Sequence, residues 1–176
     1  MLKSKRSGER MKESGTSCWK YWRKGKLFMT TANQKISEHL RQRVREWFRK
    51  AEHELAYLEH APLDLNDPPT DTTGRMAHMV AEYCLKAYLV LNKKKIKKIH
   101  DLGEILDSCI AVRNDDDFED LRADCHTLTR YRIDFAYPGH FIETISVEEA
   151  RAAIEKARRI QSFVLRKVHE LGYSQD

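Results

Sequence analysis

Apolar residues dominate one stretch of the chain, residues 76–91, which reads MAHMVAEYCLKAYLVL. Its polar positions are His78, Glu82 and Lys86, which follow one another at intervals of four residues. On an α-helix this spacing gives one narrow polar stripe and an apolar surface elsewhere. The stretch is too short and carries too many ionisable groups to span a bilayer. The pattern therefore predicts the buried central helix of a bundle, with any chemistry on its polar stripe.

The apolar positions on either side of this stretch also recur in steps of three and four residues, as they do on amphipathic helices. They predict further helices over residues 36–61, 102–110, 118–137 and 147–168. Four long helices and a shorter one, joined mostly by short loops, are typical of a bundle. We therefore predict an all-α fold, an antiparallel four-helix up-down bundle with an additional short helix.

Three local signals define where these helices begin and end. Asp101 with Glu104, and Ser146 with Glu149, have the spacing of a capping box at a helix start. Pro138 ends the helix that precedes it, because the residue before a proline avoids the helical region. The last two predicted helices are therefore separated by a loop that begins at about residue 138.

The net charge of +5 is unevenly distributed along the sequence. Residues 1–28 hold nine of the 32 basic residues and two of the 27 acidic ones, so the remainder carries 23 bases and 25 acids. Residues 1–35 also lack apolar periodicity, and we expect a basic, disordered tail there, with Met29 as an alternative start. An arm that binds RNA or a membrane surface is the less favoured interpretation of this tail. The helical domain, residues 36–172, is not basic overall, so its net charge does not indicate nucleic-acid binding.

Cysteine and histidine spacing shows no metal-binding pattern. The four cysteines lie far apart without a CxxC pair, and His39, His53 and His60 do not share one helix face at the spacing of metal ligands. We therefore expect no metal and no cofactor. A cytoplasmic location without membrane attachment is expected, because no run of seven or more apolar residues follows the basic start.

A run of lysines, NKKKIKKI, follows the central helix at residues 92–99. Such a loop can hold phosphates, but lysines at a helix end also complement the helix dipole while remaining hydrated. The hydrated loop is slightly favoured on sequence alone. His100 follows the run just before a helix start, where it either hydrogen-bonds within the loop or contacts an anion or a base.

Three motifs together resemble the HEPN domain, the helical nucleotide-binding domain of higher eukaryotes and prokaryotes. They are AEYCLKAYLV at residues 81–90, HDL at 100–102 and LTRYRIDFAYPG at 128–139, and the resemblance covers residues 36–172. It implies a helical bundle that forms a homodimer and acts with a minimal nucleotidyltransferase as a toxin and antitoxin pair. Many members of the wider superfamily are metal-independent ribonucleases, in which an Arg and a His four to six residues apart act at the dimer interface.

The motif at the end of residues 128–139 departs from that pattern. The branch that this chain most resembles carries Arg-Tyr-Pro, whereas this sequence has Ala136, Tyr137 and Pro138. Arg132 and His140 are the nearest substitute for the catalytic pair, but seven residues separate them. They converge only if the turn at Pro138 folds His140 back toward the helix.

Three functions therefore compete, and a non-enzymatic binding module is favoured. The module would bind a nucleotide, RNA or a nucleotidyltransferase partner through polar residues of the central helix, the following loop and the fourth helix: Glu82, Lys86, His100, Arg130, Asp134 and Tyr137. The alternative is a ribonuclease that uses Arg132 and His140, with Arg130 on the phosphate. The third is a structural adaptor, in which Glu82 forms an internal ion pair with Lys86, Arg130 or Arg132, because a buried carboxylate needs a partner.

Overall fold

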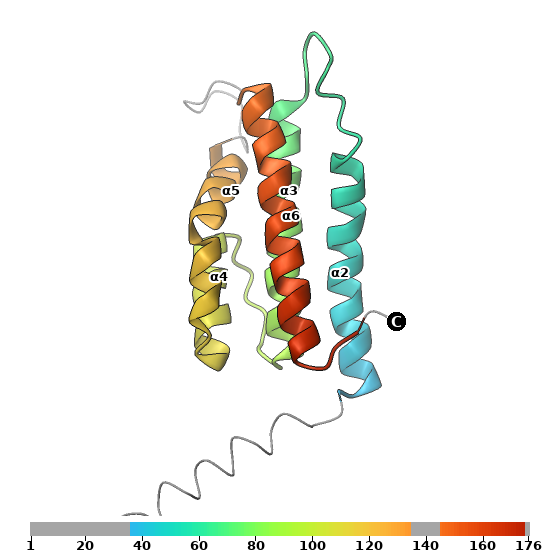
Figure 1. Ribbon diagram of the computed structural model, residues 1–176, viewed down its shortest axis with the longest axis vertical. Coiled ribbons are helices and arrows are strands. Elements are labelled where there is room, and N and C mark those ends of the chain that lie inside the picture. Colours follow the sequence, from blue (N-terminus) through green and yellow to red (C-terminus); the bar gives the residue numbers. More distant parts are fainter. Residues whose placement is uncertain (1–35, 135–144, 175–176) are drawn as a thin grey trace, which may run out of the picture. The chain divides into compact units, whose positions relative to one another are not determined.

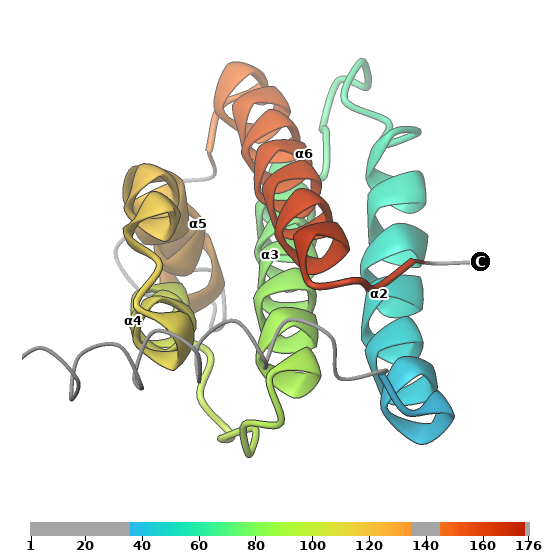
Figure 2. The ribbon, with the colours of Figure 1, turned by 60° about the horizontal axis from the view of Figure 1, so that its bottom comes forward.

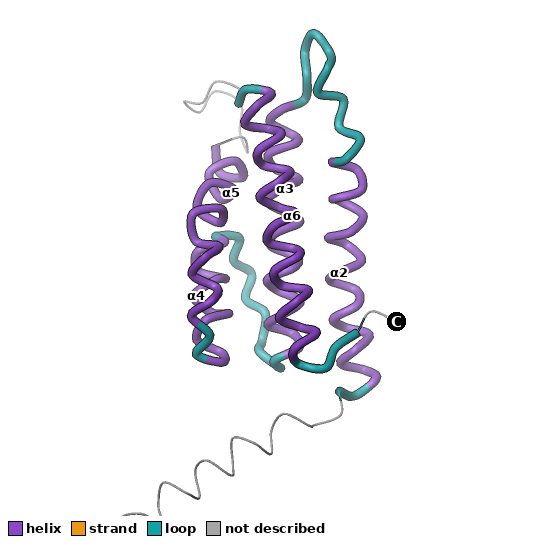
Figure 3. The backbone as a smooth tube through the Cα atoms, in the orientation of Figure 1, coloured by secondary structure: helices purple, strands orange, loops and turns teal. Residues whose placement is uncertain are grey.

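The computed structural model describes residues 36–134 and 145–174, apart from the side chains of the last two residues before the gap. These residues form helices and connecting segments, with no strand among them (Figures 1 and 3). The helices, in chain order, are α2 (Glu38–Leu58), α3 (Thr70–Leu91), α4 (Leu102–Arg113), the 3₁₀-helix η1 (Asp116–Leu121), α5 (Arg122–Asp134) and α6 (Val147–Glu170). The predicted all-α fold is confirmed. The predicted tail, residues 1–35, lies outside the described residues, as do Tyr137, Pro138 and His140.

Helix α3 is the central element of the bundle. It contacts α2, α4, α5 and α6, and 16 of its 22 residues are buried. Figures 1 and 2 show α2 on one side of α3, α4 and α5 on the other, and α6 packed along it. Followed along the chain, α2 and α5 run in one direction and α3 and α6 in the other (Figure 1). The apolar surface predicted for residues 76–91 therefore faces neighbouring helices on several sides.

The helix boundaries differ from the predicted ones at several places, and the largest difference is in α3, which begins at Thr70, six residues before the predicted stretch 76–91. The first helix begins after Ser37, whose side chain accepts a hydrogen bond from the backbone N–H of Leu40, and it ends at Leu58 rather than at residue 61. The helix predicted from residue 118 begins as η1 and becomes α-helical only at Arg122. Of the two predicted capping boxes, the one at Ser146 is complete, and at Asp101 the side chain accepts from the backbone N–H of Glu104.

The segment between α3 and α4, residues 92–101, returns alongside α3 (Figure 3). The reversal starts at Lys93, whose φ of 57° lies in the left-handed region. Asn92 holds the turn, because its side-chain amide donates to the carbonyl of Tyr88 and its side-chain oxygen accepts from Arg113 of α4. The end of this segment is not helical, so its backbone carbonyls need partners from elsewhere in the fold.

The N-terminal part of α3 approaches α5 closely at Gly74. A Cβ atom at this position would lie 3.2 Å from the side chains of Tyr131 and Ile145. A larger residue would therefore separate α3 from the end of α5 and from the residue that precedes the α6 cap. Within the described residues, no helix combines the length and the apolar character needed to cross a membrane.

Candidate functional site

The three polar residues of the α3 stripe are almost completely buried. His78, Glu82 and Lys86 are 0%, 5% and 4% exposed. Lys86 donates a hydrogen bond from Nζ to Glu82 Oε1 at 2.6 Å, so the two form an ion pair one helical turn apart. This is the internal pair that the adaptor interpretation anticipated for Glu82. The stripe is therefore a set of interior groups rather than an open charged surface.

His100 joins this stripe from the segment that returns alongside α3. Its Nδ1 atom lies 3.1 Å from each carboxylate oxygen of Glu82, and half of its side chain is exposed. Because a carboxylate only accepts hydrogen bonds, Nδ1 is the donor in this contact. We call His78, Glu82, Lys86 and His100 the Glu82 cluster.

The cluster also binds the backbone of the segment. Lys86 Nζ donates to the carbonyl of Ile99 at 2.9 Å, and His78 Nε2 donates to the carbonyl of His100 at 2.8 Å. Glu82 accepts a hydrogen bond from the ring of His100 itself. Each residue of the stripe thus has one contact with Ile99 or His100, and together they fix the last residues of the segment before α4 begins.

Burial and hydrogen bonding set the charge of each buried group. Burial lowers the pKa of His78 to about 4, although its bond to the His100 carbonyl and the charge of Glu82 act in the opposite direction. His78 is therefore neutral near pH 7, with its proton on Nε2. Burial raises the pKa of Glu82, but hydrogen bonds from Lys86 and His100 outweigh it, so the pKa lies below its usual range. The site contains an ionised carboxylate between a cation and two imidazoles.

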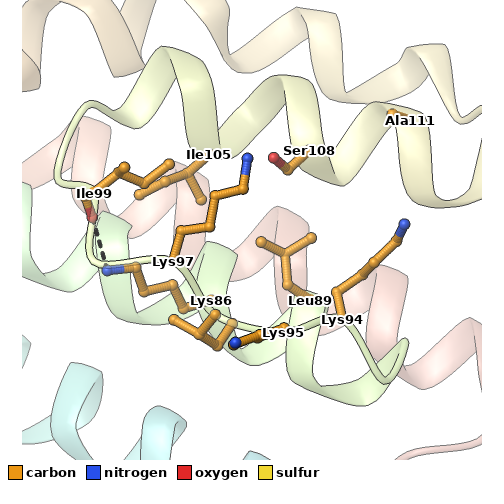
Figure 4. A pocket seen from close by; sticks show the side chains of 10 residues that line it. Lys86, Leu89, Lys94, Lys95, Lys97, Ile99, Ile105, Ser108 and Ala111 are labelled. Atoms are coloured by element: carbon orange, nitrogen blue, oxygen red, sulfur yellow. Dashed lines mark hydrogen bonds between the residues drawn. The ribbon is translucent and has the colours of Figure 1, made fainter.

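The segment between α3 and α4, which carries several lysines, forms one wall of a cavity of about 210 Å³ beside the Glu82 cluster (Figure 4). Its lining residues come from α3, the segment and α4: Lys86, Leu89, Lys94, Lys95, Ile96, Lys97, Ile99, Ile105, Ser108 and Ala111. Figure 4 shows Lys94 and Lys97 pointing from the segment toward α4, with Lys86 at the opposite end bonded to Ile99. We call this the lysine cavity. It shares Lys86 with the Glu82 cluster, so the two features form one continuous site.

Two aromatic residues border the cluster on the side of α2. The rings of Trp47 and Tyr83 lie 5.8 Å apart, and Lys86 Nζ lies 6.0 Å from the centre of the Trp47 ring. Lys50 Nζ lies 5.7 Å from the centre of the Tyr83 ring. Trp47 lies within the helix predicted over residues 36–61, but periodicity along one helix carries no information about its position beside the buried Lys86.

The structure describes only some of the site residues that were predicted on the fourth helix. Arg130 is exposed near the end of α5, and Arg132 is partly buried. The charge of Arg132 acts on the cluster, since it contributes to the lowered pKa of His78 after the larger effect of burial. Asp134 is the last residue of α5, and its side chain lies outside the described part, as do Tyr137 and His140. The structure thus brings together Glu82, Lys86 and His100, with Arg132 in electrostatic range.

The metal-binding capacity of this site is limited. Within residues 36–134 and 145–174, no three His, Cys, Asp or Glu side chains come together as a metal ion would require. The chemistry available from the described residues is therefore that of cations, a carboxylate and a half-exposed imidazole. Such groups bind phosphates and transfer protons.

Comparison with known proteins identifies the family of this chain. No curated protein and no solved structure matches the chain. The family model of the HEPN domain, a nucleotide-binding or ribonuclease-type helical module, matches residues 44–168. The match extends from α2 to the end of α6 and includes the Glu82 cluster and the lysine cavity. The chain therefore belongs to the HEPN domain family.

Proposed function

We propose that this chain is a HEPN module that binds a nucleotide or RNA at the lysine cavity. The observation that carries the proposal is the composition of the cavity wall: three exposed lysines, Lys94, Lys95 and Lys97, beside the paired Lys86, and no carboxylate among the lining residues. In the described part of the chain, Lys94, Lys95 and Lys97 have no ion-pair partner, unlike the buried Lys86 and Lys167. Lysines without a protein counter-ion are available to contact phosphates, and such contacts release the cations that surround a nucleic acid.

The remainder of the wall suits the less polar part of such a ligand. Leu89, Ile96 and Ile105 supply aliphatic surface, and Ser108 supplies a hydroxyl. A volume of about 210 Å³ holds a phosphate with part of the adjoining nucleoside, rather than a whole oligonucleotide. A longer RNA would therefore place one nucleotide in the cavity and continue across the surface toward His100, the residue after Ile99.

The buried residues of the Glu82 cluster have an indirect role in this binding. Glu82 and Lys86 are too buried to be the main ligand contacts. They bind Ile99 and His100, and so they hold the end of the segment that carries Lys94, Lys95 and Lys97. The adaptor and binding interpretations are therefore compatible, since the internal ion pair supports the surface that binds.

We also propose that the chain forms a homodimer and acts with a minimal nucleotidyltransferase in a toxin–antitoxin pair. Membership of the HEPN family and the three motifs that resemble the HEPN domain support this proposal. A co-expressed nucleotidyltransferase should elute with the chain in size-exclusion chromatography. Sedimentation of the isolated chain as a monomer at all concentrations would contradict the homodimer.

The binding proposal is tested with the full-length chain and two fluorescent probes, a short single-stranded RNA and a labelled ATP. The variant Lys94→Gln/Lys95→Gln should weaken binding of the preferred probe about tenfold. It should also reduce the slope of log K against log salt concentration by about 1.4, or 0.7 for each lost phosphate contact.

The matched control removes the same charge elsewhere. Arg43 and Arg49 are exposed on α2, away from the cavity, so Arg43→Gln/Arg49→Gln should leave affinity and salt slope nearly unchanged. An equal effect of both double variants would show that only net charge matters. Either that result or the absence of binding to both probes would overturn the proposal.

A further inference from the structure

Trp47 on α2 and Tyr83 on α3 form a pair of aromatic rings at the surface of the helical domain. Their ring centres lie 5.8 Å apart and their planes are tilted by 52°. Both residues pack against the hydrophobic core, and both remain partly exposed. Other rings of the bundle, such as those of Tyr88 and Phe118, are fully covered by neighbouring side chains. The Trp47–Tyr83 pair therefore presents aromatic surface that the described part of the chain leaves open.

Two lysines accompany this pair. Lys50 Nζ lies 5.7 Å from the centre of the Tyr83 ring, and Lys86 Nζ lies 6.0 Å from the centre of the Trp47 ring. Lys86 is bound to Glu82, whereas Lys50 is exposed and forms no ion pair within residues 36–134 and 145–174. Proteins that bind single-stranded nucleic acids combine such groups, because bases stack on the aromatic rings while cations attract the phosphates.

The charges around Tyr83 also favour a polyanion. Burial raises the pKa of Tyr83, and the carboxylates of Glu54 and Glu82 raise it further, whereas the charge of Arg132 on α5 lowers it. The phenol is therefore neutral near pH 7. Because Glu82 is already compensated by its buried lysine partner, Arg132 and Lys50 outweigh Glu54 in the surroundings of this ring. An anionic strand is thus attracted to this face rather than repelled from it.

Lys86 connects the aromatic pair to the lysine cavity. It lines the cavity, and its ammonium nitrogen is the atom that lies 6.0 Å from the centre of the Trp47 ring. Its ion-pair partner Glu82 directly precedes Tyr83 in α3. The phosphate-binding wall and the aromatic surface therefore have one residue as a common neighbour, and they belong to one continuous region of the fold.

We propose that the Trp47–Tyr83 pair stacks a base of single-stranded RNA whose neighbouring phosphate occupies the lysine cavity. The inference rests on the proposed function and narrows its ligand, because a mononucleotide fills the cavity alone whereas a strand uses both places. Stacking tolerates any sequence, since every base has a π-face. The site thus selects unpaired bases, and a duplex, whose bases already stack on one another, is a poor ligand.

The first test changes the ligand and leaves the protein intact. The full-length chain is titrated with a short fluorescent single-stranded RNA and with an oligomer of the same length that has the ribose-phosphate backbone but no bases. The intact RNA should bind about tenfold more tightly, as expected for one stacked base. Equal affinities for the two oligomers would overturn the inference.

The second test removes the rings one at a time. Trp47→Leu and Tyr83→Leu should each weaken binding of the intact RNA about tenfold and leave the affinities for the base-free oligomer and for labelled ATP unchanged. Tyr57 gives the matched control, since it is 70% exposed on the same helix as Trp47, and Tyr57→Leu should bind all three ligands like the wild type. Circular dichroism verifies folding, and the comparison of oligomers on the wild type decides the matter if a variant does not fold.

The outcomes separate this inference from the binding proposal. If Trp47→Leu weakened all three ligands equally, Trp47 would act only by supporting Lys86, and the stacking role would be overturned. Unchanged RNA affinity in Trp47→Leu, with a change from dimer to monomer in sedimentation, would assign this face to a second copy of the chain instead. Both results leave binding at the lysine cavity intact. Absence of binding of RNA and ATP by the wild type would overturn both proposals.

Discussion

His78 on α3 donates a hydrogen bond from Nε2 to the backbone carbonyl of His100, 22 residues further along the chain, at 2.8 Å. The bond joins the central helix to the residue just before the α4 cap. His78 is fully buried, and its Nδ1 lies 3.8 Å from Glu82 Oε2, too far for a hydrogen bond. Burial disfavours the charged ring more than this carboxylate favours it, so the ring is neutral in the folded chain. Protonation of His78 and folding are therefore coupled.

This coupling predicts that the free energy of unfolding decreases with acid already at pH values above those at which carboxylates titrate. Burial lowers the pKa of His78 from 6.5 in the unfolded chain to about 4 in the folded one. Between these values the unfolded chain binds more protons, so stability is lost as the pH falls. The free energy of unfolding, measured with urea, should decrease by about 2 kcal/mol between pH 7 and pH 5 through this residue.

The variant His78→Gln provides the comparison, because its amide can still donate to the His100 carbonyl but cannot titrate. Its free energy of unfolding should depend much less on pH over the same interval. Parallel pH curves for His78→Gln and the wild type would contradict the assignment of this sensitivity to His78. The range ends at pH 5 because Glu82, whose pKa is lowered in the fold, contributes its own acid loss mainly below its unfolded value of 4.5.

Removal of the central carboxylate should destabilise the fold strongly. Glu82→Ala leaves the Lys86 ammonium 4% exposed and without its carboxylate partner. Loss of one partner from a buried ion pair typically costs about 3–5 kcal/mol, and urea denaturation followed by circular dichroism measures it. A loss below about 1 kcal/mol would show that the pair is not buried as described.

Two controls define the origin of that loss. Glu46 is exposed on α2, where it accepts from Gln42, so Glu46→Ala should change the free energy of unfolding by less than about 0.5 kcal/mol. The double variant Glu82→Leu/Lys86→Met removes both charges together. It should be less destabilised than Glu82→Ala, because an apolar pair leaves no isolated charge in the interior.

The sequence identified the residues of the α3 stripe because helical periodicity is a local property. His78, Glu82 and Lys86 repeat every four residues on an otherwise apolar helix, and this pattern is sufficient to place them on one face. The caps at Asp101 and Ser146 were predictable for the same reason, since cap chemistry depends on residues three positions apart.

The partners of the stripe could not be predicted, because they depend on the path of the chain. The carbonyls of Ile99 and His100 reach Lys86 and His78 only because the chain reverses at Lys93 and returns along α3. A backbone carbonyl has no sequence signature. The 3₁₀ start at η1 was missed in a similar way, since the apolar positions of residues 118–137 fit one continuous helix.

The cap of α6 gives a local test of stability that is independent of the site. Ser146 accepts from the backbone N–H of Glu149 at 3.1 Å, and the Glu149 side chain accepts from the backbone N–H of Ser146 at 2.8 Å. Loss of such a cap in Ser146→Ala should lower the free energy of unfolding by about 1 kcal/mol. Ser162 is exposed within the same helix, so Ser162→Ala should have little effect; equal losses in thermal or urea denaturation would argue against the capping role.

The most direct test of the account is an NMR titration of the full-length chain with short single-stranded RNA. We expect the largest backbone amide shifts at Lys94–His100 and in α4 around Ser108, where the lysine cavity lies between the segment and the helix. In the variant Lys94→Gln/Lys95→Gln, these shifts should be largely lost. Saturable binding with shifts confined to other surfaces, such as α2 and α6, would contradict the assignment of the lysine cavity as the nucleotide-binding site.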